Sequence, residues 1–241
     1  MGQNRLNHLI FSITLWSLLF SFAPAVFATA ASEEFTGRAY NRYGDLVYIE
    51  KHTVTYRDEK VAESRTRYYD PNSRIIGSLI SEYSQGARYG SYVFKDLRGR
   101  YQDGAEVLED RIRIYRRETD DGDVETRFIN RKPDQIVGQG FHHFIRTHLE
   151  DIAAGEIYHV RLVLPSRLDQ FRFRIRKLKT DGDVLSVRLE IDNWLIRLFA
   201  PHVDANYDLK TRQLLRYEGI SNLSDTAGKH PKVTINYTYA G

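Results

Sequence analysis

The sequence predicts a mainly β fold: a curved antiparallel sheet, or an incomplete β-barrel, that wraps one amphipathic α-helix. Apolar and charged residues alternate with a period of two along most of the chain after residue 30, which is the pattern of strands with one buried and one solvent-facing side. Sequences typical of tight turns separate these stretches. One segment, residues 141–154, instead has the apolar spacing of a helix.

The alternation is clearest at residues 171–176, where Phe-Arg-Phe-Arg-Ile-Arg places three apolar residues on one face and three arginines on the other. Residues 111–114 repeat the pattern as Arg-Ile-Arg-Ile. Strands with one wet face favour antiparallel pairing, because parallel sheets are usually buried on both faces. Further strands are expected at residues 35–40, 46–56, 61–69, 74–83, 92–97, 125–129, 157–164, 184–191, 213–217 and 233–239.

The predicted helix has one apolar stripe, formed by Phe141, Phe144, Ile145, Leu149 and Ile152. Gly155 follows it, where a glycine commonly ends a helix. Arg146 and Glu150 have the i, i+4 spacing of a helical ion pair. A second short apolar stretch, residues 194–199, is compatible with either a helical turn or a strand.

Residues 1–30 are predicted to form a cleaved signal peptide. Arg5 is the only Arg or Lys in them, residues 9–27 are an apolar run, and Ala28-Thr29-Ala30 has the small-x-small form that a signal peptidase requires. An uncleaved membrane anchor is the alternative, since about 20 apolar residues can cross a bilayer. No linker divides residues 31–241, so we expect them to form a single β-rich domain.

The composition excludes several classes of protein. The chain has no cysteine, which rules out disulfides, thiolate metal sites, cysteine nucleophiles and a lipoprotein anchor. With 35 Lys and Arg against 32 Asp and Glu, it lacks the excess of basic residues that nucleic-acid binding usually needs. We therefore expect an exported periplasmic protein that is not a lipoprotein and binds no nucleic acid, while association with a membrane stays open.

Tyr48, Glu50 and His52 share one face of the strand predicted at residues 46–56. A carboxylate and an imidazole two residues apart, flanked by tyrosine, are able to line a cleft and exchange a proton. The alternative is a solvated face whose polar groups pair with neighbouring strands. This pair is the best polar candidate in the chain.

Three histidines on the predicted helix do not indicate a metal site. His142, His143 and His148 lack the i, i+4 spacing that paired ligands on one helix require. We expect His143 to face solvent and His148 to pack within the apolar stripe with one hydrogen bond. The sequence also lacks a nucleophile motif, a P-loop and a dinucleotide fingerprint, so no catalytic residue and no cofactor are predicted.

Short motifs give the chain a resemblance to a known family. They are Phe35-Thr36-Gly37-Arg38-Ala39-Tyr40, Tyr48-x-Glu50-x-His52, Tyr69-Asp70-Pro71, and Tyr207-Asp208 followed by Leu215-x-Tyr217-x-Gly219-Ile220-Ser221-Asn222. With these motifs the chain resembles a family of uncharacterised exported bacterial proteins, a domain of unknown function, which implies no activity. The expected architecture is similar to the LolA/LolB class of half-open periplasmic barrels, an analogy of fold alone.

These patterns favour a non-catalytic envelope protein that binds a hydrophobic or lipid-like ligand between helix and sheet. The residues expected to line this site are Tyr48, Glu50, His52, Phe141, Phe144, Ile145 and His148. The alternatives are a structural or assembly adaptor that pairs through a strand edge with an unknown protein, and an integral outer-membrane barrel. The hypothesis of an enzyme that uses Glu50 and His52 is the least favoured.

Overall fold

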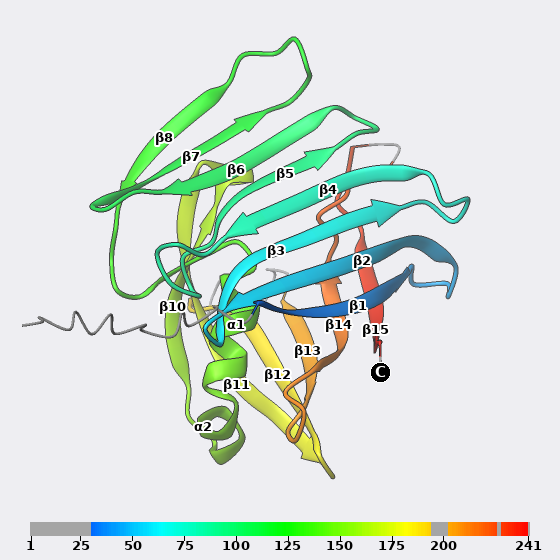
Figure 1. Cartoon of the computed structure of the whole chain (residues 1–241), viewed down its shortest axis with the longest axis vertical. Coiled ribbons are helices and arrows are strands. Elements are labelled where there is room, and N and C mark those ends of the chain that lie inside the picture. The colour runs from blue at the N-terminus through cyan, green and yellow to red at the C-terminus, as the bar shows by residue number, and fades with distance from the viewer. Residues whose placement is uncertain (1–29, 194–201, 226–227, 241) are drawn as a thin grey trace, which may run out of the picture.

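A computed structural model describes residues 30–193, 202–225 and 228–240 (Figure 1). The predicted signal peptide and the apolar stretch at residues 194–199 lie outside these residues, apart from Ala30. The strands are β1 (Ala30–Tyr40), β2 (Leu46–Arg57), β3 (Lys60–Tyr69), β4 (Ile75–Glu82), β5 (Ser91–Asp96), β6 (Tyr101–Val107), β7 (Arg111–Arg117), β8 (Glu125–Asn130), β9 (Gln135–Val137), β10 (Tyr158–Leu164), β11 (Asp169–Asp181), β12 (Val184–Ile191), β13 (Val203–Asp208), β14 (Leu214–Ile220) and β15 (Lys232–Tyr239). The helices are α1 (Gly140–Thr147) and α2 (Leu149–Ala154), and a short 3-10 turn, η1, covers Pro165–Arg167.

All fifteen described strands belong to one sheet, and the sheet is open. Its order runs from β8 back to β1, continues with β15, and then runs back to β9. The two halves meet where β1 pairs with β15, with Phe35 opposite Tyr239. Every neighbouring pair is antiparallel except β9 and β10. The predicted mainly β, curved antiparallel sheet is therefore confirmed.

Strong curvature brings the two edges of the sheet toward each other. Strands β1–β8 run steeply across β10–β15 in Figure 1. Ile112 and Ile114 of β7 share a buried cluster with Val137 of β9 and Val163 of β10. Arg116 of β7 also donates from Nη1 to the backbone oxygen of Ser166, at 2.9 Å. Side chains, rather than a ladder of backbone hydrogen bonds, thus connect the two ends of the sheet.

The expectation of one continuous helix is wrong, because the helical segment breaks at His148. This residue has φ −109° and ψ 24° and lies between α1 and α2. Its Nδ1 lies 2.9 Å from the backbone oxygen of Phe144. The ring therefore competes with the backbone for a helical acceptor at the point where the helix changes direction. Gly155 ends α2 at φ +107°, as predicted.

The predicted pairing of Arg146 with Glu150 is also wrong. Arg146 instead donates to Glu33 Oε2 and to the Tyr56 hydroxyl, each at 3.2 Å. Glu150 accepts from Arg212 in the loop between β13 and β14. Arg146 therefore binds strands β1 and β2 and Glu150 binds a loop, rather than each other.

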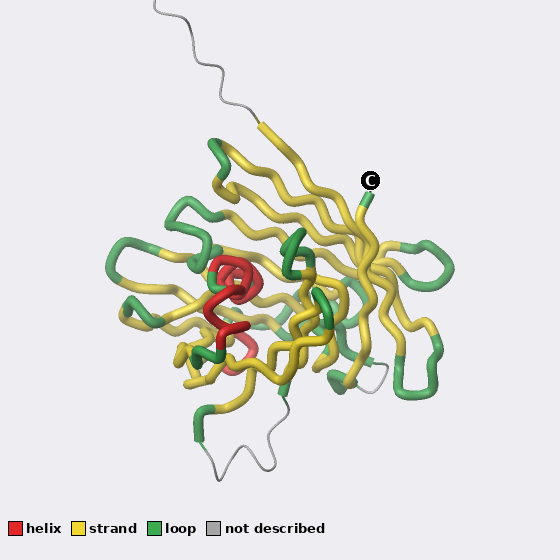
Figure 2. Tube along the Cα trace, turned by 90° about the horizontal axis from the view of Figure 1, so that it is seen from below, coloured by secondary structure: helices red, strands yellow, loops and turns green. Residues whose placement is uncertain are grey.

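The concave side of the sheet holds the helices, as Figure 2 shows from below. Their apolar residues pack into one core cluster with strands of the C-terminal half. This cluster includes Phe144, Ile145, Leu149, Ile152, Ile175, Leu185, Leu189 and Tyr207. Burying four large side chains of these helices contributes on the order of 8 kcal/mol before entropy costs, which fixes α1 and α2 against the sheet.

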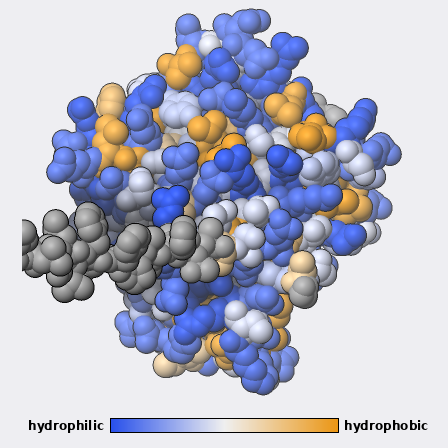
Figure 3. Space-filling view, viewed as in Figure 1, coloured by the Kyte–Doolittle hydropathy of each residue, from blue (hydrophilic) through white to orange (hydrophobic). Residues whose placement is uncertain are grey.

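The face of the molecule seen in Figure 3 is mostly hydrophilic, with scattered apolar residues. On β7, Ile112 and Ile114 are fully buried, whereas Arg111 is exposed and Arg113 is partly so. The alternating pattern of β7 therefore turns its apolar side inward, whereas in the Phe-Arg-Phe-Arg-Ile-Arg run of β11 Phe171 is exposed, Phe173 is partly buried and only Ile175 is fully buried. Among the described residues, no helix is long and apolar enough to cross a bilayer.

Candidate functional site

A pocket lies where α1 meets β1–β3, β14 and β15. It contains about 770 Å³ of empty space, part of which is open to solvent. Its lining is mainly aromatic and aliphatic with a few polar groups. The residues are Phe35, Tyr48, Glu50, His52, Val54, Ser64, Tyr68, Gln139, Phe141, His142, His143, Leu214, Tyr217, Ile220, Ser221, Asn222, Ile235 and Tyr237.

Strand periodicity explains why β2 supplies so much of this lining. Side chains two residues apart point to the same face of a strand, so Tyr48, Glu50, His52 and Val54 all face the pocket. Each of these four is at least nine-tenths buried. The prediction that Glu50 and His52 share a face is met, and that face is the buried one.

Gly37 of β1 gives the pocket room at the junction of the two halves. It lies opposite Glu50 on one side and Tyr237 on the other. A Cβ atom at this position would lie 2.7 Å from the Tyr237 ring and 3.1 Å from Glu50 Oε2. The absence of a side chain therefore allows Tyr237 and the Glu50 carboxylate to approach each other.

A chain of hydrogen bonds extends from the carboxylate of Glu50 across β2 and β3. Glu50 Oε2 accepts from the Tyr237 hydroxyl at 3.2 Å and lies 2.9 Å from His52 Nε2. His52 Nδ1 lies 2.9 Å from Thr66 Oγ1. Gln139 Nε2 donates to Thr66 Oγ1 at 3.2 Å. The chain ends at Ser64, whose hydroxyl donates to Gln139 Oε1 at 2.9 Å.

Both ring nitrogens of His52 lie within hydrogen-bonding distance of a partner. Thr66 Oγ1 already accepts from Gln139, so its own hydroxyl proton is free to donate to His52 Nδ1. In the tautomer that matches this donation, His52 Nδ1 accepts and Nε2 donates its proton to Glu50. The ring of Phe35 stacks on the imidazole at 4.3 Å with an interplanar angle of 7°, which holds it in this orientation.

Four tyrosines surround the Glu50 carboxylate. Burial raises the pKa of Tyr48, Tyr68, Tyr217 and Tyr237, and the nearby charge of Glu50 raises each pKa further. All four phenols are therefore neutral at physiological pH and act as hydrogen-bonding groups on an aromatic wall.

Helix α1 forms another wall through Phe141, His142 and His143. The expectation that His143 faces solvent is wrong, since it is 7% exposed and packs edge-on against Tyr83 at 4.8 Å. Strands of the N-terminal half cover the face of α1 that carries His143, which the apolar spacing had predicted to be solvent-facing. Burial lowers the pKa of His143 to about 4 and also lowers the pKa of His142, so both imidazoles are neutral.

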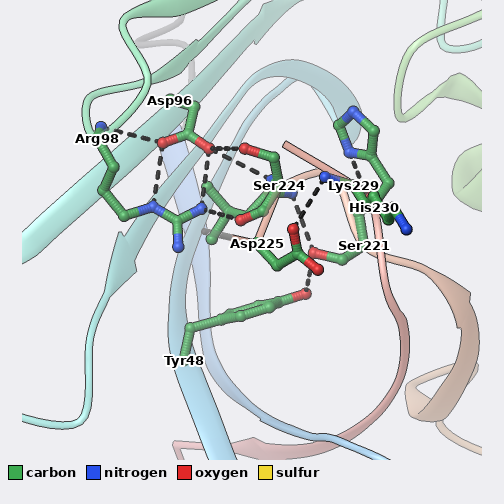
Figure 4. A network of polar contacts seen from close by, with 9 residues as sticks. Tyr48, Asp96, Arg98, Ser221, Ser224, Asp225, Lys229 and His230 are labelled. Carbon is green, nitrogen blue, oxygen red and sulfur yellow. Dashed lines mark hydrogen bonds and ion pairs between the residues drawn. The ribbon is translucent and has the colours of Figure 1, made fainter. Parts of the chain in front are cut away.

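The loop between β14 and β15, described at residues 221–225 and 228–231, borders the pocket through Ser221 and Asn222, and Figure 4 shows its polar contacts. Ser221 donates to the Tyr48 hydroxyl at 3.2 Å. Asp96 at the end of β5 accepts from the backbone and hydroxyl of Ser224, at 3.3 and 3.2 Å. Arg98 binds Asp96 through two nitrogens and also donates to the Ser224 carbonyl at 2.6 Å. The loop is thus fixed to the N-terminal half of the sheet.

The sequence-predicted site residues fall into two groups. Tyr48, Glu50, His52 and Phe141 all line this pocket. The other three do not. Phe144 and Ile145 belong to the core cluster beneath α1, and His148 stacks on Phe144 at 4.2 Å.

Sequence reasoning missed the contribution of the C-terminal strands. Tyr217, Ile235 and Tyr237 reach the pocket because β15 pairs with β1. The period-two pattern of residues 233–239 was visible in the sequence, but it did not indicate which strand would pair with this one.

Within the described ranges, no three His, Asp or Glu side chains are grouped so that they could hold a metal ion.

The fold and site define an open, curved antiparallel β-sheet protein with an aromatic pocket under a helix. No family model matches the sequence, and no curated protein matches it. Among solved structures, the chain is similar to a crystal structure described as a β-barrel-like protein of domain of unknown function DUF1849 from Brucella abortus. The two share 9% identity with a TM-score of 0.36, over 88% of this chain and 97% of that one.

That description names an uncharacterised domain with a barrel-like fold. A likeness at this level of identity and structural overlap carries no functional residue over to this chain. Similarity to the LolA/LolB carriers and export from the cytoplasm stay predictions.

Proposed function

We propose that this protein is a non-catalytic component of the bacterial envelope that binds one small hydrophobic ligand in the pocket beneath α1. The observation that carries the proposal is the pocket itself, in which aromatic and aliphatic walls surround a small set of fixed polar groups. Concave, largely apolar sites with few convergent polar groups are typical of small-molecule binding.

The size of the pocket favours a small ligand or the end of a longer one. Its roughly 770 Å³ of empty space includes a part that opens to solvent. Ile220, on the pocket lining, is 38% exposed and so borders the mouth. A ligand would enter beside Ile220 and reach inward toward Glu50, and a long chain would extend out of the mouth.

The polar groups support binding rather than catalysis. Glu50, His52 and Thr66 form a carboxylate–imidazole–hydroxyl chain, an order that catalytic triads also use. However, Thr66 is 1% exposed and is not part of the pocket lining. Both ring nitrogens of His52 are also engaged. The link from Glu50 through His52 to Thr66 therefore orients the Glu50 carboxylate and does not present the Thr66 hydroxyl to a ligand.

The distribution of charge favours a protein that is surrounded by water. Ile112 and Ile114 of β7 and Ile175 of β11 are buried, although Phe171 at the start of β11 is exposed together with Arg172. A barrel embedded in a membrane would turn its apolar residues outward. The inward orientation of these isoleucines supports the prediction of a periplasmic protein over the alternative of an integral membrane barrel.

Titration with N-phenyl-1-naphthylamine, a neutral apolar fluorophore, tests the proposal. We expect saturable fluorescence enhancement with one probe per chain. Ile220→Trp should narrow the mouth and weaken binding at least about tenfold, a loss of about 1.4 kcal/mol. Ile80→Trp is the matched control, because Ile80 is 37% exposed and does not line the pocket. Absence of saturable binding, or equal binding by both variants, would overturn the proposal.

An exposed sheet edge favours a second candidate, an assembly adaptor. Strand β8 lies at the end of the sheet, and four of its six residues in a row, from Glu125 to Phe128, are exposed. Such an edge is able to pair with a strand of another protein, although Arg127 and Glu125 are charges of the kind that discourage pairing. Site-specific crosslinking from Thr126 in intact cells would capture a protein partner if this candidate is correct, and none if it is not.

A further inference from the structure

The structure assigns a charge preference to the pocket: we infer that its ligand carries an organic ammonium group, which binds between Glu50 and the surrounding aromatic rings. This inference rests on the proposed function and names the ligand class of the same site. It narrows the expectation of a general lipid to a cationic, amine-bearing molecule with an apolar part.

The first step is the set of charges around the pocket. Among the described residues that line it, Glu50 is the only Asp or Glu, and none is Lys or Arg. Arg146, on the same helix as His142 and His143, does not line the pocket, since its guanidinium binds Glu33 and Tyr56. The nearest balancing groups are therefore the three histidines of the lining.

The second step is the protonation of those histidines. Both ring nitrogens of His52 are engaged, one by Thr66 and the other by Glu50. Burial lowers the pKa of His142 and His143. The carboxylate of Glu50 is hydrogen bonded by His52 and Tyr237, and no Lys or Arg lines the pocket beside it.

The third step concerns the cost of that arrangement. Glu50 is 4% exposed, and burying a carboxylate is expensive even when it is hydrogen bonded. A cation in the pocket would remove this cost, because the attraction between charges is strong where water is excluded. An anionic headgroup such as a carboxylate or phosphate would add a second negative charge and be rejected.

The aromatic rings supply the remaining recognition. Phe35, Tyr48, Tyr68, Tyr217 and Tyr237 line the same pocket as Glu50. The faces of such rings attract a cation within about 6 Å of their centres, and aromatic cages of this composition are suited to ammonium ligands. An alkylammonium suits both the carboxylate and the apolar part of the lining. Its charge would pair with Glu50, and its methyl groups and alkyl chain would pack against the apolar walls.

Three probes with the same eight-carbon chain test the inference: octyltrimethylammonium, octanol and octanoate. Each is titrated against protein loaded with N-phenyl-1-naphthylamine, and displacement is followed by fluorescence. We expect octyltrimethylammonium to bind about tenfold or more tightly than octanol, and octanoate to bind most weakly. Equal or tighter binding of octanol or octanoate would overturn the charge preference while leaving the proposed function intact.

The variant Glu50→Gln isolates the carboxylate, because it keeps the shape and one acceptor oxygen. The preference for octyltrimethylammonium over octanol should then fall to about twofold or less. Glu106→Gln is the control, since Glu106 lies on β6 outside the pocket and its loss changes the net charge equally. A preference that Glu50→Gln leaves unchanged would overturn the inference.

If Glu50→Gln does not fold, the ranking of the three probes on the unmodified protein still decides the charge preference. If neither the naphthylamine nor any octyl probe binds, the proposed function itself fails.

Discussion

Glu50 and His52 stand two residues apart on one face of β2, and Glu50 Oε2 lies 2.9 Å from His52 Nε2. Both side chains are more than nine-tenths buried. Two polar groups at this depth need partners, and strands from three parts of the chain provide them: Thr66 on β3, Tyr237 on β15 and Phe35 on β1. The pair therefore couples the two halves of the sheet at the pocket.

Substitution His52→Ala should destabilise the protein by about 2–4 kcal/mol, because it removes the Phe35 stack and one buried hydrogen bond each from Glu50 and Thr66. Urea unfolding followed by circular dichroism measures the change. His159→Ala is the control, since the His159 side chain is 52% exposed. A loss under about 0.5 kcal/mol for His52→Ala would show that the buried chain contributes little.

Gly37→Ala should both destabilise the fold and reduce the pocket. The added Cβ would lie 2.7 Å from the Tyr237 ring and 2.8 Å from Ile235, so both side chains must move. We expect a loss of about 1–3 kcal/mol together with weaker binding of N-phenyl-1-naphthylamine. Gly99→Ala is the matched control, because a Cβ there meets no atom within 4 Å. Equal behaviour of the two variants would contradict the assigned geometry.

Asp96→Ala should release the loop that borders the pocket. Burial alone would raise the pKa of Asp96, but hydrogen bonds from Arg98 outweigh it and the pKa is lowered, so the carboxylate is charged in the native state. Its removal leaves Ser224 without its side-chain acceptor. Amide hydrogen exchange at Ser224 should accelerate at least about tenfold, with smaller changes in β7. Uniform acceleration throughout the sheet would instead indicate global destabilisation.

Asp103 should make stability depend on pH. Burial raises its pKa to about 7, against 3.8 ordinarily, and the hydrogen bond from Tyr101 offsets only part of that effect. Its stabilising contribution is present below pH 4 and is lost as the pH rises through 7, because the native state then has to hold a buried charge. Asp103→Asn should therefore be more stable than the unmodified protein at pH 8, by about 2–4 kcal/mol.

Thermal unfolding at pH 5 and pH 8 compares the two proteins. The advantage of Asp103→Asn should shrink markedly at pH 5, where the native protein already holds Asp103 protonated. An advantage of equal size at both pH values would point to packing rather than to titration of this group.

Local patterns predicted most of the strands, and the exceptions have physical causes. Strand β6 was missed because Asp103 and Gly104 interrupt its apolar alternation. In β13 only Ala205 and Tyr207 are buried, too few for a recognisable period, and β9 spans three residues. Period-two patterning reports burial on one face, so strands rich in polar or small residues escape it.

The candidate site was predictable only as far as one strand determines it. Tyr48, Glu50 and His52 follow from alternation within β2, whereas Tyr237 depends on the pairing of β15 with β1, which no local pattern encodes. The helix break was equally hidden, since the side chain of His148 ends α1 by binding the backbone of Phe144. The prediction for His143 was wrong because apolar spacing identifies only one buried face of a helix, whereas two faces of α1 are packed against the sheet.

The most direct test of the account is a crystal structure of the protein with bound N-phenyl-1-naphthylamine. We expect electron density for one probe beneath α1, between the ring of Phe35 and the loop residue Asn222. Density on the outer face of the sheet, with the pocket beneath α1 unfilled, would contradict the claim that this pocket is the ligand-binding site.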